Sequence, residues 1–521
     1  MHTTRRNFIK TTGVSTAGIA FMPGLSQVSN LFTGYFPISL PYASPESKGV
    51  SSKGITNFIQ AANASGIDWH SFMLVRHGHV VAEGWWKPFE PTFKHTLYSL
   101  SKSFTSSAIG LLVKEGKLKV DEPVISFFKD EIPATPDENL KKMKIKSLLT
   151  MNTGHAEDTM PKLRESNKSW TTTFLEQSVK FEPGSHFLYN TGATYMLGAI
   201  VHKVTGETLE KYLAPRLFQP LEITGYDWEV SPQGLNTAGY GLRVKTEDIA
   251  KFGQLYLQKG KWNGNEILTE DWVDEATRYE TKSQEGNGDW SVGYGYQFWR
   301  CKPGGYRADG AFGQFCFILP EQDAVMVITG ESFNTQKSMT IVWDTILPAM
   351  QANALPENPA ALAEMKKEIK NLALPVAKGS PSSALSSKYN GKKFTLSPNE
   401  FDATEMKITF SKETCSLTTN TAQQKETTYK FGLGNWFLNQ DTMKYIFPVA
   451  GRFHMPSKLA GSAAWVNENT LQLSARFVEA MHGDKITCSF EGDKITVSFM
   501  NSVAENSKTS PEKRMNLVGS I

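Results

Sequence analysis

From residue 98 the chain reads Tyr98-Ser99-Leu100-Ser101-Lys102-Ser103-Phe104, and helical spacing of apolar residues continues to Lys114. The apolar side chains that recur at helical intervals are Leu97, Phe104, Ala108, Leu111 and Leu112. Gly116 follows and is typical of a helix C-terminus. The stretch therefore predicts a long buried helix with Ser99 at its start.

Strand patterns lie on both sides of this helix. Residues 72–83 predict two short strands joined by a turn at Gly78, and residues 293–330 alternate apolar and polar side chains over several strands. Helices are expected at 55–62, 144–151, 194–204 and 246–258, and the polar segment 156–170 is expected to be a loop beside the cleft. Neither strand group is large enough for its own sheet. We therefore expect both groups to share one sheet with helices packed on it, an α+β fold.

The C-terminal part of the chain has a different pattern. A charged amphipathic helix is expected at 357–373, followed by the linker composition of residues 378–383. The segment 484–490 is nearly repeated at 493–499, with Glu491-Gly492 between them, which predicts a hairpin of two similar strands. These patterns give three regions: a first domain at 45–350, a helix and linker at 351–387, and a small antiparallel all-β domain, barrel or sandwich, at 388–521.

Composition narrows the possible partners. The chain has 521 residues and a formal net charge of +3, with both signs interspersed. Without a Lys/Arg block, nothing favours a nucleic-acid or membrane-surface partner. The four cysteines lack zinc-finger spacing, and no cofactor or metal is expected. Cys301 and Cys316 flank one expected hairpin and could pair, although free buried thiols are the preferred interpretation.

The first thirty residues have the pattern of an export signal. They contain Thr4-Arg5-Arg6-Asn7-Phe8-Ile9-Lys10, followed by a weakly apolar stretch from Val14 to Leu25. Paired arginines, an aromatic and an aliphatic residue, a lysine and a short apolar stretch are typical of twin-arginine export. The apolar stretch is too short for a permanent anchor. We therefore expect residues 1–30 to direct export, and a periplasmic or secreted protein without a stable membrane anchor after processing.

Ser99 and Lys102 are candidates for nucleophilic catalysis. Residues three apart on a helix lie on one face within side-chain reach. A serine hydroxyl becomes an effective nucleophile when a base takes its proton, and a lysine can do so when burial lowers its pKa. The same Ser-x-x-Lys spacing occurs at Ser126 and Ser510, but only Ser99 opens a long apolar helix.

Two later segments strengthen this hypothesis. Tyr189 lies in a loop ahead of the helix expected at 194–204, where its phenol could share protons with Lys102. We expect a neighbouring ammonium to lower the pKa of this tyrosine. Residues 308–314 form a glycine-rich strand start, and a backbone N–H there could complete an oxyanion hole with that of Ser99.

In this order and at these separations, the segments resemble the serine β-lactamase and penicillin-binding-protein superfamily. The nearest resemblance is to class C-like β-lactamase-related hydrolases, which include esterases, D-amino-acid-specific peptidases and 6-aminohexanoate-dimer hydrolases. It covers roughly residues 45–350, with supporting segments at 44–49, 116–124, 148–154 and 246–253. The resemblance implies a β-lactamase/transpeptidase-like antiparallel sheet flanked by helices.

The resemblance also implies roles for single residues. Ser99 corresponds to the acylated nucleophile, Lys102 to its base partner and Tyr189 to the tyrosine of the Y-x-N motif. The N–H groups of Ser99 and Ala311 correspond to the oxyanion hole. Substrate contacts are expected at Thr191, Ala308, Asp309 and Gly310.

The chain departs from the family pattern at two of these positions. Thr191 stands where Y-x-N has its Asn, and Ala308 stands where Lys or His often precedes x-Gly. In penicillin-recognising relatives these positions contact the substrate amide and carboxylate. Arg300, Lys302 or Arg307 could replace the cation, whereas Asp309 would repel an anionic substrate.

These departures favour an exported serine hydrolase that cleaves an ester or amide bond of a small-molecule or peptide-like substrate. Two alternatives stay open. The protein could be a true β-lactamase or D-Ala-D-Ala carboxypeptidase. It could also be a non-catalytic cell-wall or peptide binding protein, an interpretation that the intact Ser99, Lys102 and Tyr189 disfavour.

Overall fold

The computed structural model describes residues 40–421, 425–442, 447–448, 455–507 and 509–521. These residues fall within one compact unit. The expected export signal, residues 1–30, lies outside the described residues. Among the residues that are described, no helix has the length and apolar character needed to cross a membrane.

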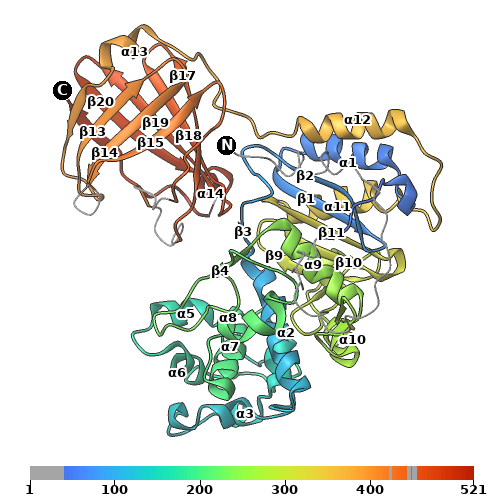
Figure 1. Cartoon of the computed structure of the whole chain (residues 1–521). Coiled ribbons are helices and arrows are strands. Elements are labelled where there is room, and N and C mark those ends of the chain that lie inside the picture. Colours follow the sequence, from blue (N-terminus) through green and yellow to red (C-terminus); the bar gives the residue numbers. More distant parts are fainter. Residues whose placement is uncertain (1–39, 422–424, 443–446, 449–454, 508) are drawn as a thin grey trace, which may run out of the picture. The chain divides into compact units, whose positions relative to one another are not determined.

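The larger domain is built on a six-stranded sheet in the order β2-β1-β11-β10-β9-β8 (Figure 1). Its strands are β1 (Asp68–Arg76), β2 (His79–Trp85), β8 (Trp299–Arg300), β9 (Tyr306–Gly310), β10 (Gln314–Leu319) and β11 (Ala324–Glu331). The first strand pairs antiparallel with the last, in a register that sets Phe72 opposite Ile328. The expectation that the early and late strand groups share one sheet is therefore confirmed.

Both faces of this sheet are covered by helices, because successive side chains of a strand point to opposite faces. On one face, Phe72 and Leu74 pack with α1 (Ser52–Ala64), α11 (Thr335–Thr345) and α12 (Pro359–Lys370). On the other face, Met73 and Val75 pack with α9 (Thr246–Leu257), which lies across the sheet in Figure 1. The sheet is thus the middle layer of three.

The two cores explain the state of the cysteines. Cys301 packs in the core beside α1, whereas Cys316 packs in the core beside α9. The two thiols therefore lie in cores on opposite faces of the sheet and are free and buried, as are Cys415 and Cys488. The preferred interpretation, free buried thiols, is confirmed.

A helical region lies between β2 and β8 in sequence. Its helices are α2 (Ser101–Lys114), α3 (Glu138–Lys142), α4 (Ile145–Leu149), α5 (Met160–Glu165), α6 (Trp170–Leu175), α7 (Thr191–Thr205), α8 (Leu209–Leu213), α9 and α10 (Glu270–Thr277). Short strands β3 (His95–Thr96), β4 (Asp227–Trp228), β5 (Leu242–Val244), β6 (Lys261–Trp262) and β7 (Asn265–Glu266) accompany them. The segment 156–170, expected to be a loop, contains α5, because Met160 and Leu163 bury one face of a short helix that the polar composition concealed.

The C-terminal part forms a closed barrel (Figure 1). Its strands are β12 (Lys393–Leu396), β13 (Ala403–Phe410), β14 (Thr414–Thr421), β15 (Thr427–Leu433), β16 (Phe437–Leu438), β17 (Leu459–Asn467), β18 (Thr470–Phe477), β19 (Gly483–Glu491), β20 (Lys494–Asn501) and β21 (Leu517–Ser520), with α13 (Ala384–Tyr389) and α14 (Ser502–Asn506). The repeated sequence forms the β19–β20 hairpin, as predicted. Closure comes from a parallel pairing of β15 with β17 that the sequence did not indicate.

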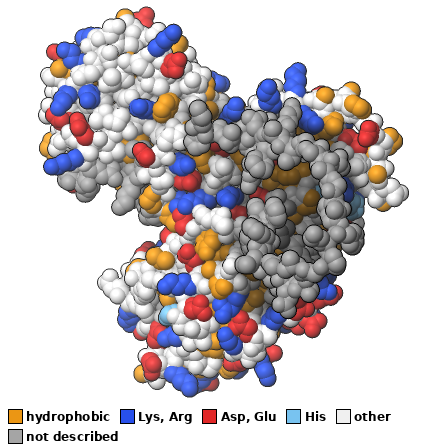
Figure 2. All heavy atoms as spheres, viewed as in Figure 1, with side chains coloured by type: hydrophobic (Ala, Val, Ile, Leu, Met, Phe, Trp, Pro, Cys, Tyr) orange, Lys and Arg blue, Asp and Glu red, His pale blue; other side chains and the backbone are white. Residues whose placement is uncertain are grey.

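The surface carries charges of both signs. On the face shown in Figure 2, Lys and Arg side chains are interspersed with Asp and Glu. Some charged side chains of the surface form exposed ion pairs, such as that of Lys168 with Glu176. Exposed pairs of this kind contribute roughly 0–1 kcal/mol each to stability, so the fold depends mainly on the buried cores.

Candidate active site

Ser99 lies in a 3-10 turn, Tyr98–Leu100, directly before α2. The predicted α-helix therefore begins at Ser101, two residues after the nucleophile. Tyr98 has a φ of 49°, in the left-handed region that non-glycine residues rarely adopt. Such backbone strain beside a reactive side chain is typical of functional sites. Ser99 itself is partly exposed and can meet a ligand.

Lys102 lies one turn along α2 and is 1% exposed. Its Nζ donates to Ser99 Oγ at 3.1 Å and to Gly239 O at 2.8 Å. Burial lowers the pKa of Lys102 from 10.5 to about 7, although the negative charge of Asp158 acts to raise it. A large fraction of this side chain is therefore neutral amine at neutral pH, able to accept the Ser99 proton.

Tyr189 lies ahead of α7, and its ring is beside the same amine. The ring centroid is 5.0 Å from Lys102 Nζ, and the ring stacks on Trp299 with centroids 5.6 Å apart. Burial raises the pKa of Tyr189 above its ordinary value, and a hydrogen bond with Ser99 offsets only part of that rise. The expected lowering of this pKa was wrong, because burial raises it and the negative charges of Asp309 and Asp158 act in the same direction. The phenol stays protonated and can donate a proton.

The two residues after Tyr189 hold the start of α7. Asn190 caps the helix, since its Oδ1 accepts from the Ala193 amide at 3.3 Å. The Thr191 amide donates to Asp158 Oδ1 at 2.8 Å, and its hydroxyl accepts from Lys102 Nζ at 3.4 Å. The hydroxyl therefore retains a polar contact with the amine at the position where the Y-x-N pattern has an amide.

Gly239 also belongs to the site, through its backbone carbonyl. Its carbonyl receives the shortest of the Lys102 hydrogen bonds given above. A Cβ at this position would lie 2.8 Å from Thr191 Cγ2 and 3.2 Å from Lys102 Nζ. The two residues are 137 positions apart in sequence, so no local pattern could reveal the contact.

The end of β9 lies against the nucleophile segment. A Cβ at Gly310 would be 2.1 Å from the Leu97 carbonyl oxygen, so glycine permits this close approach. Ala311 follows and is exposed, and its carbonyl accepts from Gln314 Nε2 at 3.1 Å. The strand end therefore lies near Ser99, as the expected oxyanion hole requires.

Comparison with known proteins places this part of the chain in a family. The family model described as Beta-lactamase matches residues 55–351, which is more than half of the chain. This chain belongs to the Beta-lactamase family. The match contains Ser99, Lys102 and Tyr189 as well as the end of β9.

Proteins with several different names are similar in sequence or fold to this part of the chain. The 6-aminohexanoate-dimer hydrolase of Paenarthrobacter ureafaciens is 24% identical over 282 residues, which is 49% of this chain and 71% of that protein. The beta-lactamase of Escherichia coli (strain K12) is 23% identical over 192 residues, 32% of this chain and 50% of that protein. A provisionally assigned 6-aminohexanoate-dimer hydrolase from Bacillus anthracis superposes with a TM-score of 0.50 at 20% identity, covering 61% of this chain and 89% of that one. The last likeness concerns the fold alone.

In this Beta-lactamase-family hydrolase, two charged side chains of β9, Arg307 and Asp309, neutralise each other. Arg307 is 0% exposed, and its Nε donates to Asp309 Oδ2 at 2.9 Å. Trp290 Nε1 donates to the same oxygen at 3.1 Å. The guanidinium also lies over the rings of Trp290 and Trp299. Arg307 is therefore a buried structural cation, paired with Asp309.

This pairing changes the expectations for substrate binding. The Asp309 side chain is 11% exposed and balanced by Arg307, so the expected repulsion of anions is largely cancelled. Of the other candidate cations, Arg300 donates to Thr277 O at 2.7 Å and Lys302 to Asn287 O at 3.2 Å. Ala308 is 0% exposed and packs in the core, which gives its side chain a packing role in place of substrate contact.

The chemistry assembled at Ser99 is proton transfer. An amine with a pKa of about 7 and a protonated phenol both lie beside one hydroxyl. Among the described residues, no group of three or more His, Cys, Asp and Glu is arranged to hold a metal ion. The arrangement can activate a serine and protonate a leaving group, which are the two demands of acyl transfer.

Proposed function

We propose that this protein is a two-step serine hydrolase that cleaves neutral esters, and amides of similar shape, through an acyl-enzyme on Ser99. One observation carries the proposal: a fully buried amine, with a pKa of about 7, lies 3.1 Å from the serine hydroxyl. Burying a charged amine costs free energy, and buried groups with strongly shifted pKa values cluster at functional sites. A role as general base explains why the lysine is buried next to a serine.

In the acylation step Ser99 Oγ attacks the carbonyl carbon while its proton passes to neutral Lys102. The carbonyl oxygen becomes an oxyanion, which the N–H groups of Ser99 and Ala311 stabilise as hydrogen-bond donors. The carbon–oxygen bond of the ester then breaks. Tyr189 donates a proton to the departing alkoxide, and the resulting phenolate takes the proton of the Lys102 ammonium, which restores the phenol and the neutral amine.

In the deacylation step a water molecule takes the place of the alcohol. The water oxygen attacks the acyl carbon while neutral Lys102 accepts a proton from the water. When the second tetrahedral intermediate collapses, the bond to Ser99 Oγ breaks and the serine recovers its proton from the ammonium. The products are the carboxylic acid and the regenerated enzyme.

The walls around Tyr189 favour uncharged, apolar substrates. Tyr294 and Trp299 form a small buried aromatic cluster against which Phe187, Tyr189 and Trp290 pack. Aromatic faces contribute apolar contact area without a formal charge. Because Arg307 is already paired with Asp309, its charge is balanced before a substrate carboxylate binds. This is the reason for preferring esters and amides over β-lactams or D-Ala-D-Ala peptides.

A substrate panel on the purified protein tests this preference. We expect kcat/KM for p-nitrophenyl acetate and butyrate to exceed that for nitrocefin by about 100-fold, the effect of an absent carboxylate partner of roughly 2–3 kcal/mol. A higher kcat/KM for nitrocefin would instead indicate a β-lactamase. Faster release of D-alanine from a D-Ala-D-Ala peptide would indicate a carboxypeptidase. Binding of all these compounds without turnover would identify a binding protein.

We also propose that the protein is exported by the twin-arginine route. The proposal rests on the order of residues from Arg5 to Lys10 and on the short apolar stretch after them. Replacing Arg5 and Arg6 together by lysine is expected to keep the protein in the cytoplasm of a twin-arginine-competent host. Cell fractionation and immunoblotting measure this, with the unaltered chain as control. Equal export of both forms would contradict the proposal.

A further inference from the structure

The loop that connects β18 and β19, residues 478–482, packs on the larger domain. Val478 is completely buried and belongs to the core beside α1. Met481 is 1% exposed, and its sulfur accepts from Gln314 Nε2 at 3.1 Å. The same Gln314 side chain bonds the Ala311 carbonyl. A barrel loop is therefore linked directly to the turn that carries the expected oxyanion donor.

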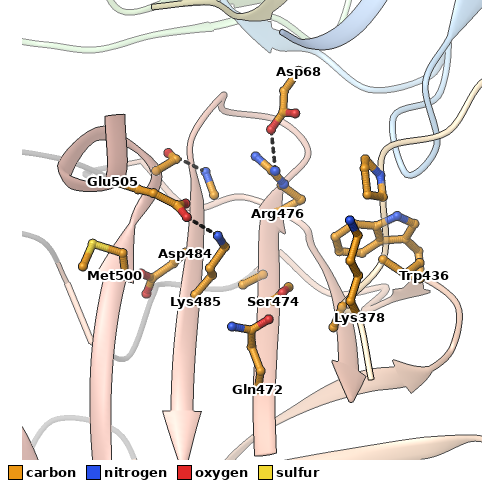
Figure 3. Close-up of a pocket in the computed structure, with 16 residues that line it drawn as sticks. Asp68, Lys378, Trp436, Gln472, Ser474, Arg476, Asp484, Lys485, Met500 and Glu505 are labelled. Carbon is orange, nitrogen blue, oxygen red and sulfur yellow. Dashed lines mark hydrogen bonds and ion pairs between the residues drawn. The ribbon is translucent and has the colours of Figure 1, made fainter. Parts of the chain in front are cut away.

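Glu331 fixes this junction from the other side. It is the last residue of β11 and is 4% exposed. Its carboxylate accepts hydrogen bonds from His482 Nδ1 at 2.6 Å, from Arg476 Nη1 at 3.2 Å and from the Ser502 hydroxyl. Arg476 also pairs with Asp68, as Figure 3 shows at the edge of a cavity of about 330 Å³. Because a buried carboxylate needs partners, the barrel completes the environment of Glu331.

The second ring nitrogen of His482 reaches the residue before the nucleophile. His482 Nε2 lies 2.7 Å from the Tyr98 hydroxyl. A carboxylate only accepts, so Nδ1 carries the proton in the bond to Glu331, and in the neutral imidazole Nε2 then accepts from the phenol. A carboxylate bonded to one ring nitrogen fixes the orientation of a histidine, as it does for metal-bound histidines. The other ring nitrogen can then orient the group that it contacts. The series of hydrogen bonds from Glu331 through His482 therefore reaches Tyr98, the residue directly before Ser99.

The same histidine contacts both sides of the expected oxyanion hole. Tyr98 precedes Ser99, and Phe312 follows Ala311. Both have left-handed backbones, with φ of 49° and 63°. The His482 ring lies 6.1 Å from the Tyr98 ring and 5.1 Å from the Phe312 ring, centroid to centroid. Sparsely populated backbone conformations persist where the surroundings hold them, and here one barrel residue packs against both.

We propose that His482, supplied by the C-terminal barrel, is a positioning residue that aligns the oxyanion donors of Ser99 and Ala311. The inference rests on the proposed acyl transfer. It gives the barrel a defined role: the barrel closes the junction at Glu331 and thereby sets the geometry of the nucleophile turn. Misplacing catalytic groups by about 1 Å can cost roughly 100-fold in rate, so the effect should fall on kcat.

The test compares His482→Ala and Tyr98→Phe with the unaltered protein on a p-nitrophenyl ester. Each variant is expected to lower kcat about 10- to 100-fold while KM changes less than about twofold. The double variant should be no slower than the slower single variant, because both changes break one link. His482→Gln, which can still accept from the phenol, should restore part of kcat. Tyr98→Phe removes one oxygen and keeps the ring packing, so it tests the link even if His482→Ala does not fold.

A matched control comes from the same junction. Lys458 lies over the Phe93 ring, 5.2 Å from its centroid, and takes no part in the Tyr98 link. Lys458→Ala should retain kcat within about twofold. A second readout is the rate at which a fluorophosphonate labels Ser99, which should fall in parallel with kcat in the Tyr98 and His482 variants.

The outcomes separate the two proposals. If unaltered protein neither turns over esters nor is labelled, the proposed function fails and this inference fails with it. If unaltered protein is active but Tyr98→Phe and folded His482→Ala keep full kcat and labelling rate, the positioning role alone is wrong. Strictly additive losses in the double variant, or losses confined to KM, would also overturn it.

Discussion

Replacing Lys102 by methionine is expected to lower kcat/KM for a p-nitrophenyl ester about 10³- to 10⁴-fold, since general base catalysis supplies rate factors up to that size. Methionine has nearly the length of lysine and no charge, so it suits a site that is 1% exposed. It leaves Gly239 O without the 2.8 Å hydrogen bond, a loss of about 1–3 kcal/mol. Thermal unfolding followed by circular dichroism checks that the variant is folded at the assay temperature.

The pH dependence identifies the same amine in the unaltered protein. Burial lowers the pKa of Lys102 to about 7, and only the neutral form can accept a proton. We therefore expect kcat/KM to rise with pH below about 7 and to become constant above it. Lys102→Arg, whose guanidinium stays protonated, should be inactive across the range. An acid limb centred near pH 5, or activity retained in Lys102→Arg, would assign the base to another group.

Replacing Ser99 by alanine is expected to reduce ester turnover by about 10⁴-fold or more, because the covalent route is lost entirely. The change removes one oxygen from a partly exposed side chain, so the unfolding temperature should change little. The steady-state release of p-nitrophenol measures the effect.

The chain contains a matched control for this variant. Ser126 and Lys129 have the same spacing as Ser99 and Lys102, but the serine is exposed and lies in a short 3-10 helix. Ser126→Ala should keep full activity. Turnover by Ser99→Ala at the level of unaltered protein would show that the hydrolysis proceeds without this serine.

The sheet and the nucleophile pair could be predicted because their signals are local. The apolar residues on both sides of the Gly78 turn in residues 72–83 mark two strands directly, and Ser99 and Lys102 are neighbours on one short segment. The Arg307–Asp309 pair was also within reach of sequence reasoning, since residues two apart on a strand point to the same face. The hypothesis that Arg307 binds substrate overlooked that rule.

Other features depend on tertiary packing that no local pattern encodes. The Tyr98–His482 contact joins residues 384 positions apart and requires the barrel to be placed against the larger domain. The pKa of Tyr189 depends on burial, which sequence neighbours do not reveal, so the expected direction of its shift was wrong. Gly239 contacts Lys102 through a carbonyl, a group that every residue type carries. The residue type at position 239 therefore gave no indication that it contacts Lys102.

The most direct test of the account is covalent labelling with a fluorophosphonate, followed by peptide mapping with mass spectrometry. The account predicts one adduct per chain, located on Ser99, absent from Ser99→Ala, retained in Ser126→Ala and formed much more slowly in Lys102→Met. An adduct on a different residue, or undiminished labelling of Ser99→Ala, would contradict the assignment of Ser99 as the nucleophile.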